Sequence, residues 1–235
     1  MSSPDDPVYA TREGGVAEIV LNRPGRRNAV TGPLASRLHA EIVAATEDDD
    51  VAVLLLRGAG GAFCSGLDLG EFRADPPPEW MPAFSGLWLD VHAALYDCPK
   101  PIVAALERFA INAGSALALA ADLLVAGEQA FLHVGEIQMG MAAPMNMAWL
   151  RLRHPESVAA RLAIVGRRYT GTELERMGVA AEVVADDQVL NRARELSATI
   201  AGYPRNGVRS IKQTVLRGRT AASGHEWFAR IRGDS

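Results

Sequence analysis

Residues 101–126, PIVAALERFAINAGSALALAADLLVA, contain the pattern that decides the fold class. Two apolar segments, Pro101–Leu106 and Asp122–Ala126, lie on either side of a segment of small residues. The apolar segments have the length of buried strands, and the small residues between them have the composition of a buried helix. Strands that alternate with helices along a chain predict an α/β fold.

The predicted helix begins with Asn-Ala-Gly-Ser at residues 112–115. The first backbone N–H groups of any helix have no partners within that helix. Such a helix start is a place for an anion, or for a negative charge that develops during a reaction. We therefore expect a ligand at this point of the chain.

The same alternation of strands and helices continues on both sides of this stretch. Further strands are expected at residues 16–21, 51–57, 130–134 and 180–184. Helices are expected at residues 33–48, 145–153, 156–166, 170–178, 186–201 and 205–217. The clearest loop is the proline-rich DPPPEWMP, residues 75–82. The chain is therefore expected to form an α/β core followed by a mostly helical region.

Composition and charge exclude several classes of function. With 235 residues, of which 49% are hydrophobic, the chain is long enough for one large domain with a core. Its net charge of −4 and its lack of a long basic tract argue against a nucleic-acid partner. The sequence has no apolar run long enough for a membrane span, and its polar, acidic N-terminus is unlike a signal peptide. Two cysteines make no disulfide framework, so we expect a cytoplasmic protein.

A glycine-rich segment, GAGGAFCSGLDLGEF, follows a predicted strand at residues 58–72. Gly61 and Gly66 have the spacing of a phosphate-binding loop, but Leu67-Asp68 stands where that loop needs Lys and Ser or Thr. The dinucleotide-binding fingerprint fails as well, because its third glycine is missing. The segment is therefore either a surface turn or a loop whose backbone binds a ligand.

Cys64 lies within this segment and allows two interpretations. It is either a nucleophile with His133 as its base, or a small buried cysteine. Nothing in the sequence pairs the two residues, so the second interpretation is favoured.

Five segments of the chain carry a resemblance to a known family. They are LNRPGRRNAVTGPL (residues 21–34), RGAGGAFCSGLDL (57–69), the stretch quoted first (101–126), AFLHVGEIQMGMAAP (130–144) and RRYTGTELERMGVAAEVV (167–184). Together and in this order they resemble the enoyl-CoA hydratase/isomerase (crotonase) family. The resemblance implies a crotonase-like spiral of ββα units over residues 1–185 and a helical C-terminal region over residues 186–235.

Members of that family bind acyl-CoA thioesters and stabilise an enolate formed from the thioester carbonyl. The resemblance therefore implies an acyl-CoA substrate, with coenzyme A as part of the substrate and no separate cofactor. It also implies a homotrimer or a dimer of trimers, with the helical C-terminal region serving oligomerisation. No metal is expected, because the histidines are scattered without metal-ligand spacing at His39, His92, His133, His154 and His225.

The resemblance assigns an oxyanion hole to two backbone N–H groups. They belong to Ala113, at the start of the predicted helix, and to Leu67, in the glycine-rich segment. A donor aimed at developing negative charge is typically worth ~3 kcal/mol of barrier. The family usually has three glycines where this chain has Asn112, Ala113 and Gly114. Asparagine tolerates unusual backbone angles, so the turn is expected to persist, whereas the methyl group of Ala113 narrows the site.

Two positions decide the reaction within the family. Hydratases use two glutamates, and this chain has Ala116 at the first position and Glu136 at the second. A side chain at position 116, one turn after Ala113, is expected to point toward the same thioester. One carboxylate suffices to move a proton from C2 to C4, so the resemblance implies a Δ3,Δ2-enoyl-CoA isomerase with Glu136 as the acid/base. The motif GMAAP, residues 140–144, also resembles single-glutamate isomerases.

Three alternatives to an isomerase stay open. The first two, an enoyl-CoA hydratase and an acyl-CoA hydrolase, are other activities of the same family. The third is an acyl-CoA-binding protein without catalysis, against which the presence of Glu136 speaks.

The resemblance also implies residues that contact the substrate. Arg26 and Arg27 are candidates for the phosphates of coenzyme A, with Ala29 and Ala62 beside the adenine. The other implied binding positions are Ser65, Gly66, Asp68, Leu69, Gly114, Gly135 and Gly140. Three tryptophans either line the acyl pocket or pack in the core or at an interface, namely Trp80, Trp88 and Trp149.

Overall fold

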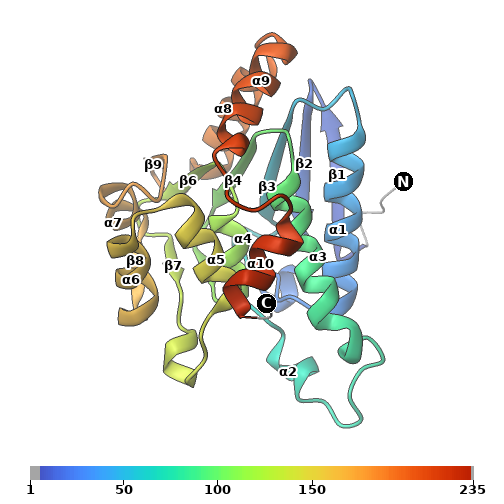
Figure 1. Cartoon of the computed structure of the whole chain (residues 1–235), viewed down its shortest axis with the longest axis vertical. Coiled ribbons are helices and arrows are strands. Elements are labelled where there is room, and N and C mark those ends of the chain that lie inside the picture. Colours follow the sequence, from blue (N-terminus) through green and yellow to red (C-terminus); the bar gives the residue numbers. More distant parts are fainter. Residues whose placement is uncertain (1–5, 234–235) are drawn as a thin grey trace.

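The computed structural model describes residues 6–233, and a six-stranded sheet is its central element (Figure 1). The strands in spatial order are β1 (Val8–Glu13), β2 (Val16–Leu21), β3 (Val53–Gly58), β4 (Ile102–Leu106), β6 (Leu123–Gly127) and β9 (Glu182–Val184). The β1–β2 pair is antiparallel, and the other neighbouring strands are parallel. The central strands β3 and β4 are almost wholly buried, as parallel strands covered on both faces are.

A second, three-stranded sheet carries the chain toward the predicted ligand-binding helix. It contains β5 (Phe109–Ile111), β7 (Phe131–His133) and β8 (Arg168–Thr170), in this order. The β5–β7 pair is parallel, and the β7–β8 pair is antiparallel. An isolated bridge between Cys64 and Ala110 places the glycine-rich segment alongside β5.

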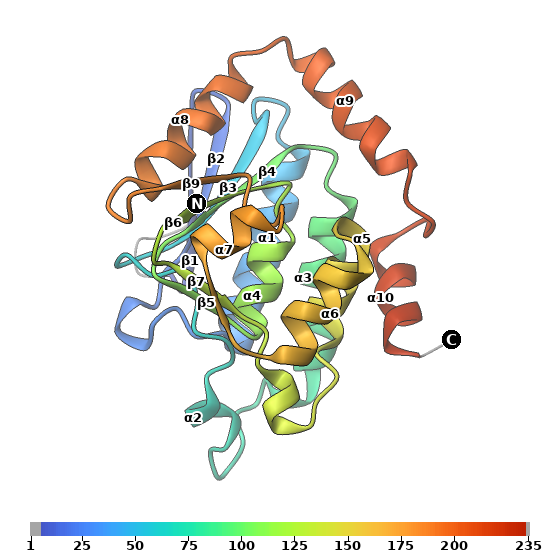
Figure 2. The same cartoon turned by 90° about the vertical axis from the view of Figure 1, so that its left-hand side faces the viewer.

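Helices cover both faces of the main sheet (Figures 1 and 2). They are α1 (Gly32–Glu47), α2 (Leu69–Phe72), α3 (Phe84–Asp97), α4 (Ala113–Leu119), α5 (Pro144–Arg153), α6 (Glu156–Val165), α7 (Gly171–Arg176), α8 (Val189–Ala201), α9 (Arg205–Arg217) and α10 (Gly224–Arg232). A short 3₁₀ helix, η3 (Glu136–Met139), lies between β7 and α5. Helix α1 packs against α3 and the first two strands, whereas α8 packs against β3 and β4.

The core is divided by the main sheet. Along β3, Leu54 and Leu56 belong to the larger hydrophobic cluster, while Val53 and Leu55 belong to a smaller one that includes residues of α8. Successive side chains of a strand point to opposite faces, so this strand contributes to both clusters. The larger cluster also contains most of α4, which is therefore a buried helix.

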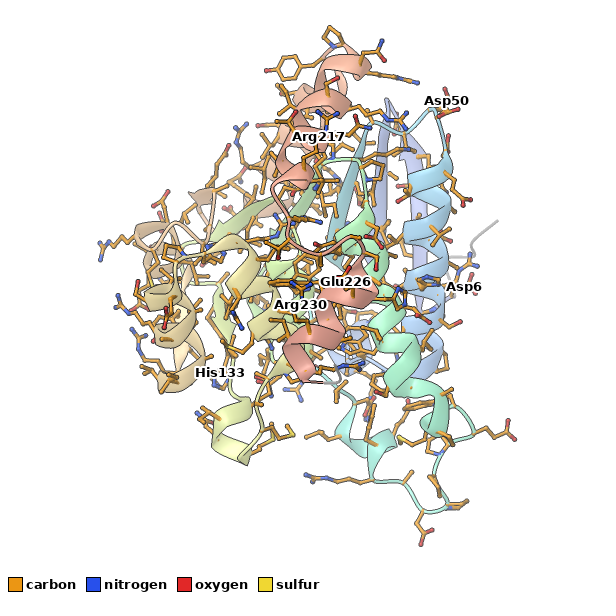
Figure 3. All side chains as sticks on the ribbon, in the orientation of Figure 1. Asp6, Asp50, His133, Arg217, Glu226 and Arg230 are labelled. Atoms are coloured by element: carbon orange, nitrogen blue, oxygen red, sulfur yellow. The ribbon has the colours of Figure 1, made fainter. Side chains whose placement is uncertain are left out.

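The last described helix, α10, packs against α3 and α5. Its exposed face carries Glu226 and Arg230, which form an ion pair of 2.7 Å (Figure 3). Its opposite face buries Trp227 and Phe228, and the Trp227 indole donates to the carbonyl of Ala148 in α5 at 3.2 Å. The C-terminal helix thereby extends the layer formed by α3 and α5.

The α/β class is confirmed, and each expected strand and helix occurs, with the expected ends for residues 16–21 and 205–217 and with shifted ends for the others. The residues quoted first differ in one respect, because Phe109–Ile111 forms a strand and the helix begins only at Ala113. Elements β1, β5, β8, α2, α3 and α10 have no counterpart among the elements expected from the sequence. Within the described residues no helix is long and apolar enough to cross a membrane. The structure contains one chain, so the expected trimer stays a prediction. The division of the chain at residue 185 stays a prediction as well.

Candidate active site

A cavity of about 420 Å³ lies beside the N-terminus of α4. This volume is in the range of ~300–1,000 Å³ that is usual for small-molecule sites. The apolar part of its wall includes Leu69, Phe72, Phe84, Trp88, Met139, Met141 and Met145. The polar side chains on the wall include Ser65, Asn112, Glu136 and Asn146. An apolar cavity with a few convergent polar groups is the usual form of a binding or active site.

The glycine-rich segment is held against the start of α4 by main-chain hydrogen bonds. The Ile111 N–H donates to the Cys64 carbonyl at 3.0 Å, and the Cys64 N–H donates to the Phe109 carbonyl at 3.2 Å. Two glycines permit this approach. Gly66 has a φ of +92°, and a Cβ atom added to it would lie 2.9 Å from the Ile111 carbonyl oxygen. A Cβ atom added to Gly114 would lie 2.5 Å from the Cys64 carbonyl oxygen. Larger residues at these positions would force the two segments apart.

Leu67 and Ala113 lie on the cavity wall at this junction. Ala113 is the first residue of α4, so its N–H has no acceptor within the helix. Leu67 is bridged to Val30, but the hydrogen bonds of this bridge use the Gly66 carbonyl and the Asp68 N–H instead of the Leu67 N–H. Within the described part of the chain neither amide donates a hydrogen bond. Two free donors beside one cavity suit an oxygen that gains negative charge.

Asn112, immediately before α4, joins the helix start to the segment that carries Glu136. Its φ of 51° and ψ of −111° lie outside the regions that most residues occupy. Its N–H donates to the His133 carbonyl at 2.8 Å, and its side-chain Oδ1 accepts the Gly135 N–H at 2.8 Å. The unusual backbone conformation is therefore held by hydrogen bonds on both sides of the residue.

Glu136 is the first residue of η3, and only 8% of it is exposed. Its Oε1 accepts a hydrogen bond of 2.8 Å from Nδ2 of Asn146, which lies on α5. Its Oε2 is buried and has no partner among the described residues. Burial raises the pKa of Glu136, while hydrogen bonds from its own backbone and from Asn146 oppose the rise. A carboxyl group with a raised pKa and an unoccupied oxygen is suited to taking and returning a proton.

Aromatic rings form the wall opposite these polar groups. The Phe72 and Phe84 rings meet edge to face with centroids 4.8 Å apart, and Phe84 stacks on Trp88 at 6.1 Å. Trp80 contacts Phe72 from outside the cavity, with 5.2 Å between centroids. Trp149 is fully buried in the core. Of the three tryptophans considered as pocket residues, Trp88 therefore lines the cavity, and the other two pack elsewhere.

A family model described as enoyl-CoA hydratase/isomerase matches residues 11–229. The chain belongs to this family. It is 36% identical over 211 residues to the probable enoyl-CoA hydratase EchA14 of Mycobacterium tuberculosis, which covers 89% of this chain and 81% of the relative. It is 29% identical over 212 residues to the 1,2-epoxyphenylacetyl-CoA isomerase of Escherichia coli, which covers 88% of this chain and 81% of the relative.

Solved structures of the family have the same fold. A probable enoyl-CoA hydratase/isomerase from Mycobacterium abscessus is similar to this chain with a TM-score of 0.78 and 30% sequence identity. The likeness covers 96% of this chain and 87% of that chain. The crotonase-like fold expected from the sequence is therefore confirmed.

The structure brings some of the predicted site residues together and leaves others apart. Those on the cavity wall are Ser65, Leu67, Leu69, Ala113 and Glu136. Those outside it are Arg26, Arg27, Ala29, Ala62, Gly66, Asp68, Gly114, Gly135 and Gly140. Three of the second set, Gly66, Gly114 and Gly135, have their backbones packed closely behind the site. The coenzyme A contacts assigned to the others stay predictions.

Arg26 and Asp68, both assigned to coenzyme A, bind each other. Their ion pair measures 2.8 Å, and Arg23 forms a second pair with Asp68 at 3.1 Å. The Arg26 guanidinium, together with Arg23, lowers the pKa of Asp68 to about 2. Asp68 also caps the N-terminus of α2 by accepting the Glu71 N–H. The structural role of Asp68 is therefore to hold the start of α2 against the segment that contains both arginines.

The expectation that a side chain at position 116 points toward the thioester stays a prediction. Ala116 is fully buried in the larger hydrophobic cluster and does not reach the cavity wall. Like the other residues of α4 from Gly114 to Leu119, it is buried. A carboxylate at this position would have to be buried there, which is unfavourable without a partner.

Cys64 and His133 do not form a nucleophile and its base. Cys64 is fully buried, its Sγ donates to the carbonyl of Asn28 at 3.1 Å, and burial raises its pKa to about 12. His133 has its Nε2 at 3.0 Å from the Gly166 carbonyl oxygen. Within residues 6–233, no three His, Cys, Asp or Glu side chains gather closely enough to hold a metal ion.

Asn146 and most of the apolar wall were not predicted from the sequence. Asn146 is 1% exposed and donates from Nδ2 both to Glu136 and, at 3.1 Å, to the carbonyl of Asn112. Its only signal in the sequence is a polar residue within an otherwise apolar helix start, MNMAW. Phe84, on α3, was not predicted because that helix was not expected, whereas Trp88 was among the candidates for the pocket.

Proposed function

We propose that this chain is an acyl-CoA-processing enzyme that moves a double bond from C3 to C2 of an enoyl thioester. The observation that carries the proposal is the count of carboxylates on the cavity wall. Among the described residues Glu136 is the only Asp or Glu there, and it lies beside the free amides of Leu67 and Ala113. An isomerisation needs one acid/base, whereas hydration is served by two.

The proposed reaction follows from these positions. The thioester carbonyl oxygen accepts hydrogen bonds from the N–H groups of Leu67 and Ala113. Oε2 of Glu136 takes a proton from C2, and the electron pair of the broken C–H bond forms a dienolate. The negative charge of the dienolate rests on the thioester carbonyl oxygen. The same carboxyl group returns the proton to C4, which leaves the double bond between C2 and C3. Each donor contributes ~3 kcal/mol toward lowering the barrier.

The rest of the cavity fits an acyl group. Phe72, Phe84 and Trp88 offer an apolar surface on which a hydrocarbon chain or ring can be buried at about 25 cal/mol per Å². A water-poor wall also strengthens the hydrogen bonds made to the dienolate. We propose that the acyl group lies against this wall, with coenzyme A as the remaining part of the same substrate.

The test uses Glu136→Gln, which keeps the shape of the side chain and removes its base. Wild-type protein and the variant are incubated with a panel of 3-enoyl-CoA thioesters while double-bond position, hydration and free coenzyme A are followed. We expect the wild type to form 2-enoyl-CoA and the variant to lose about 100-fold or more of its turnover. Acyl-CoA affinity should stay within about tenfold, because Gln retains the contacts of the cavity wall.

A matched control is Glu128→Gln, since Glu128 is exposed and lies outside the cavity. This variant should turn over like the wild type. Wild-type-like turnover in Glu136→Gln would refute the single-base mechanism.

Hydration is the second candidate, and one observation favours it. Oδ1 of Asn146 is buried on the cavity side of α5 and has no partner in the described chain. It can accept a hydrogen bond from a water molecule that Glu136 deprotonates. A second panel, of 2-enoyl-CoA thioesters, decides between the two reactions, because a hydratase converts 2-enoyl-CoA to a hydroxyacyl thioester and an isomerase does not.

A further inference from the structure

Asn146 holds Glu136 and the start of α4 with a single amide group. Its Nδ2 donates to Oε1 of Glu136 at 2.8 Å and to the carbonyl oxygen of Asn112 at 3.1 Å. Both partners are acceptors, so the NH₂ end of the amide must face them and the Oδ1 end must face away. The hydrogen-bond network therefore fixes the orientation of this side chain.

We propose that Asn146 is a positioning residue that selects Oε2 of Glu136 as the atom that exchanges the proton. The assignment rests on the proposed role of Glu136 as the acid/base. Oε1 is occupied by the Asn146 amide, while Oε2 is buried and without a partner among the described residues. The remaining Nδ2 hydrogen bond, to Asn112, ties the carboxyl group to the helix whose first N–H faces the cavity. One amide thus sets the position of the base relative to an oxyanion donor.

Geometry also makes Asn146 the main side chain that favours the charged form of Glu136. A donor bonded to a carboxylate stabilises the ion, which opposes the effect of burial. The titratable or charged groups on the surrounding elements are His133 of β7, Arg151 and Arg153 of α5, Glu156 and Arg161 of α6, and His225, Glu226, Arg230 and Arg232 of α10. Arg153 pairs with Asp122, His225 with Asp90 and Arg230 with Glu226, and within the described residues no ion pair includes Glu136. Burial is the largest cause of the raised pKa of Glu136, and Asn146 is its one side-chain partner.

The first test variant is Asn146→Leu, which has similar volume and no donor. The carboxyl carbons of ¹³C-glutamate-labelled protein are titrated by NMR, and the Glu136 signal is identified by its absence in Glu136→Gln. We expect the pKa of Glu136 to rise in Asn146→Leu, because the ion loses its donor. In the isomerase assay, kcat should fall about tenfold or more with little change in KM, and the acidic limb of the pH profile should move to higher pH.

Two further variants complete the experiment. Met147 lies on the same helix as Asn146 but outside the cavity. As a control, Met147→Leu should leave the titration of Glu136 and the pH profile of turnover unchanged. Asn146→Asp keeps the shape of the side chain and serves if the leucine variant does not fold. It places a second carboxyl group beside Glu136, so the pair should titrate in two steps with the upper one above the wild-type value.

The outcomes separate this proposal from the proposed function. If folded Asn146→Leu titrates like the wild type and its pH profile does not move, the positioning role is wrong, even if kcat falls. If no thioester in the panel is turned over, the proposed function fails, but the NMR titration still decides whether Asn146 controls Glu136.

Discussion

Replacing Asn112 with alanine should destabilise the protein more than replacing it with glycine. Asn112 has a φ of 51°, a conformation that glycine adopts freely, that asparagine tolerates and that alanine disfavours. Both variants lose the side-chain oxygen that accepts the Gly135 N–H at 2.8 Å. The difference between them therefore isolates the cost of the backbone conformation from the cost of the hydrogen bond.

The magnitudes follow from these two contributions. Leaving the Gly135 N–H without a partner costs about 1–3 kcal/mol in either variant. A residue other than glycine in a sparsely populated region costs about 1–3 kcal/mol more, and this applies fully to alanine. Glycine loses about 0.5–1 kcal/mol relative to alanine through the entropy of the unfolded chain. Asn112→Ala should therefore be less stable than Asn112→Gly by about 1 kcal/mol at the middle of these ranges and by about 2.5 kcal/mol at most.

Urea unfolding at one fixed protein concentration measures this difference, because the midpoint shifts while the slope stays constant. Ala113→Gly is the matched control, since Ala113 is the next residue and has no positive φ. There glycine should be less stable than alanine by up to ~1 kcal/mol, which is the opposite sign. Equal stability of the two Asn112 variants would refute the claim that the backbone conformation at this position is strained for alanine.

Two further predictions concern the packing and the charges around the site. Gly114→Ala should destabilise the protein by about 2 kcal/mol or more, because the added Cβ would lie 2.5 Å from the Cys64 carbonyl oxygen. Gly86→Ala should be neutral or stabilising, because no atom lies within 4 Å of a Cβ added there. Thermal unfolding of both variants measures the difference. The pKa of Asp68 is lowered from 3.8 to about 2, so its contribution to stability is present above pH 3.8 and is lost as the pH falls toward 2. The destabilisation caused by Asp68→Asn should accordingly shrink over that interval, and a pH-independent difference in unfolding free energy would contradict the assignment.

The fold could be predicted largely because the buried elements have strong patterns. Strands β3, β4 and β6 contain continuous apolar runs of four or five residues, and such runs have few alternatives in an α/β chain. The elements that were missed have weak patterns for physical reasons. Strand β1 is an edge strand with three exposed residues, whereas β5 and β8 have three residues each and depend on pairing with β7. Helix α3 follows a proline-rich loop and contains a glycine, which obscures its periodicity.

The candidate site divides in the same way. The role proposed for Leu67 and Ala113 uses main-chain groups, so their side chains carry no signal, and only the resemblance to a family could point to them. Glu136 was found because a carboxylate at that position belongs to the family pattern. Asn146 could not be found, since its role depends on α5 lying against η3, which is a property of the tertiary structure.

The two asparagines show why such side chains are needed in this particular site. Glu136 lies on a 3₁₀ helix of four residues, and so short an element has too few internal hydrogen bonds to fix its own direction. The proposed oxyanion donors, Leu67 and Ala113, lie outside η3, so the proposed base and these donors are aligned only if contacts join the segments that carry them. Asn112 accepts a hydrogen bond from Gly135, directly before Glu136, and Asn146 donates to the carboxyl group itself. The alignment of base and donors is therefore maintained by side-chain amides from outside η3, at positions 34 residues apart in the chain.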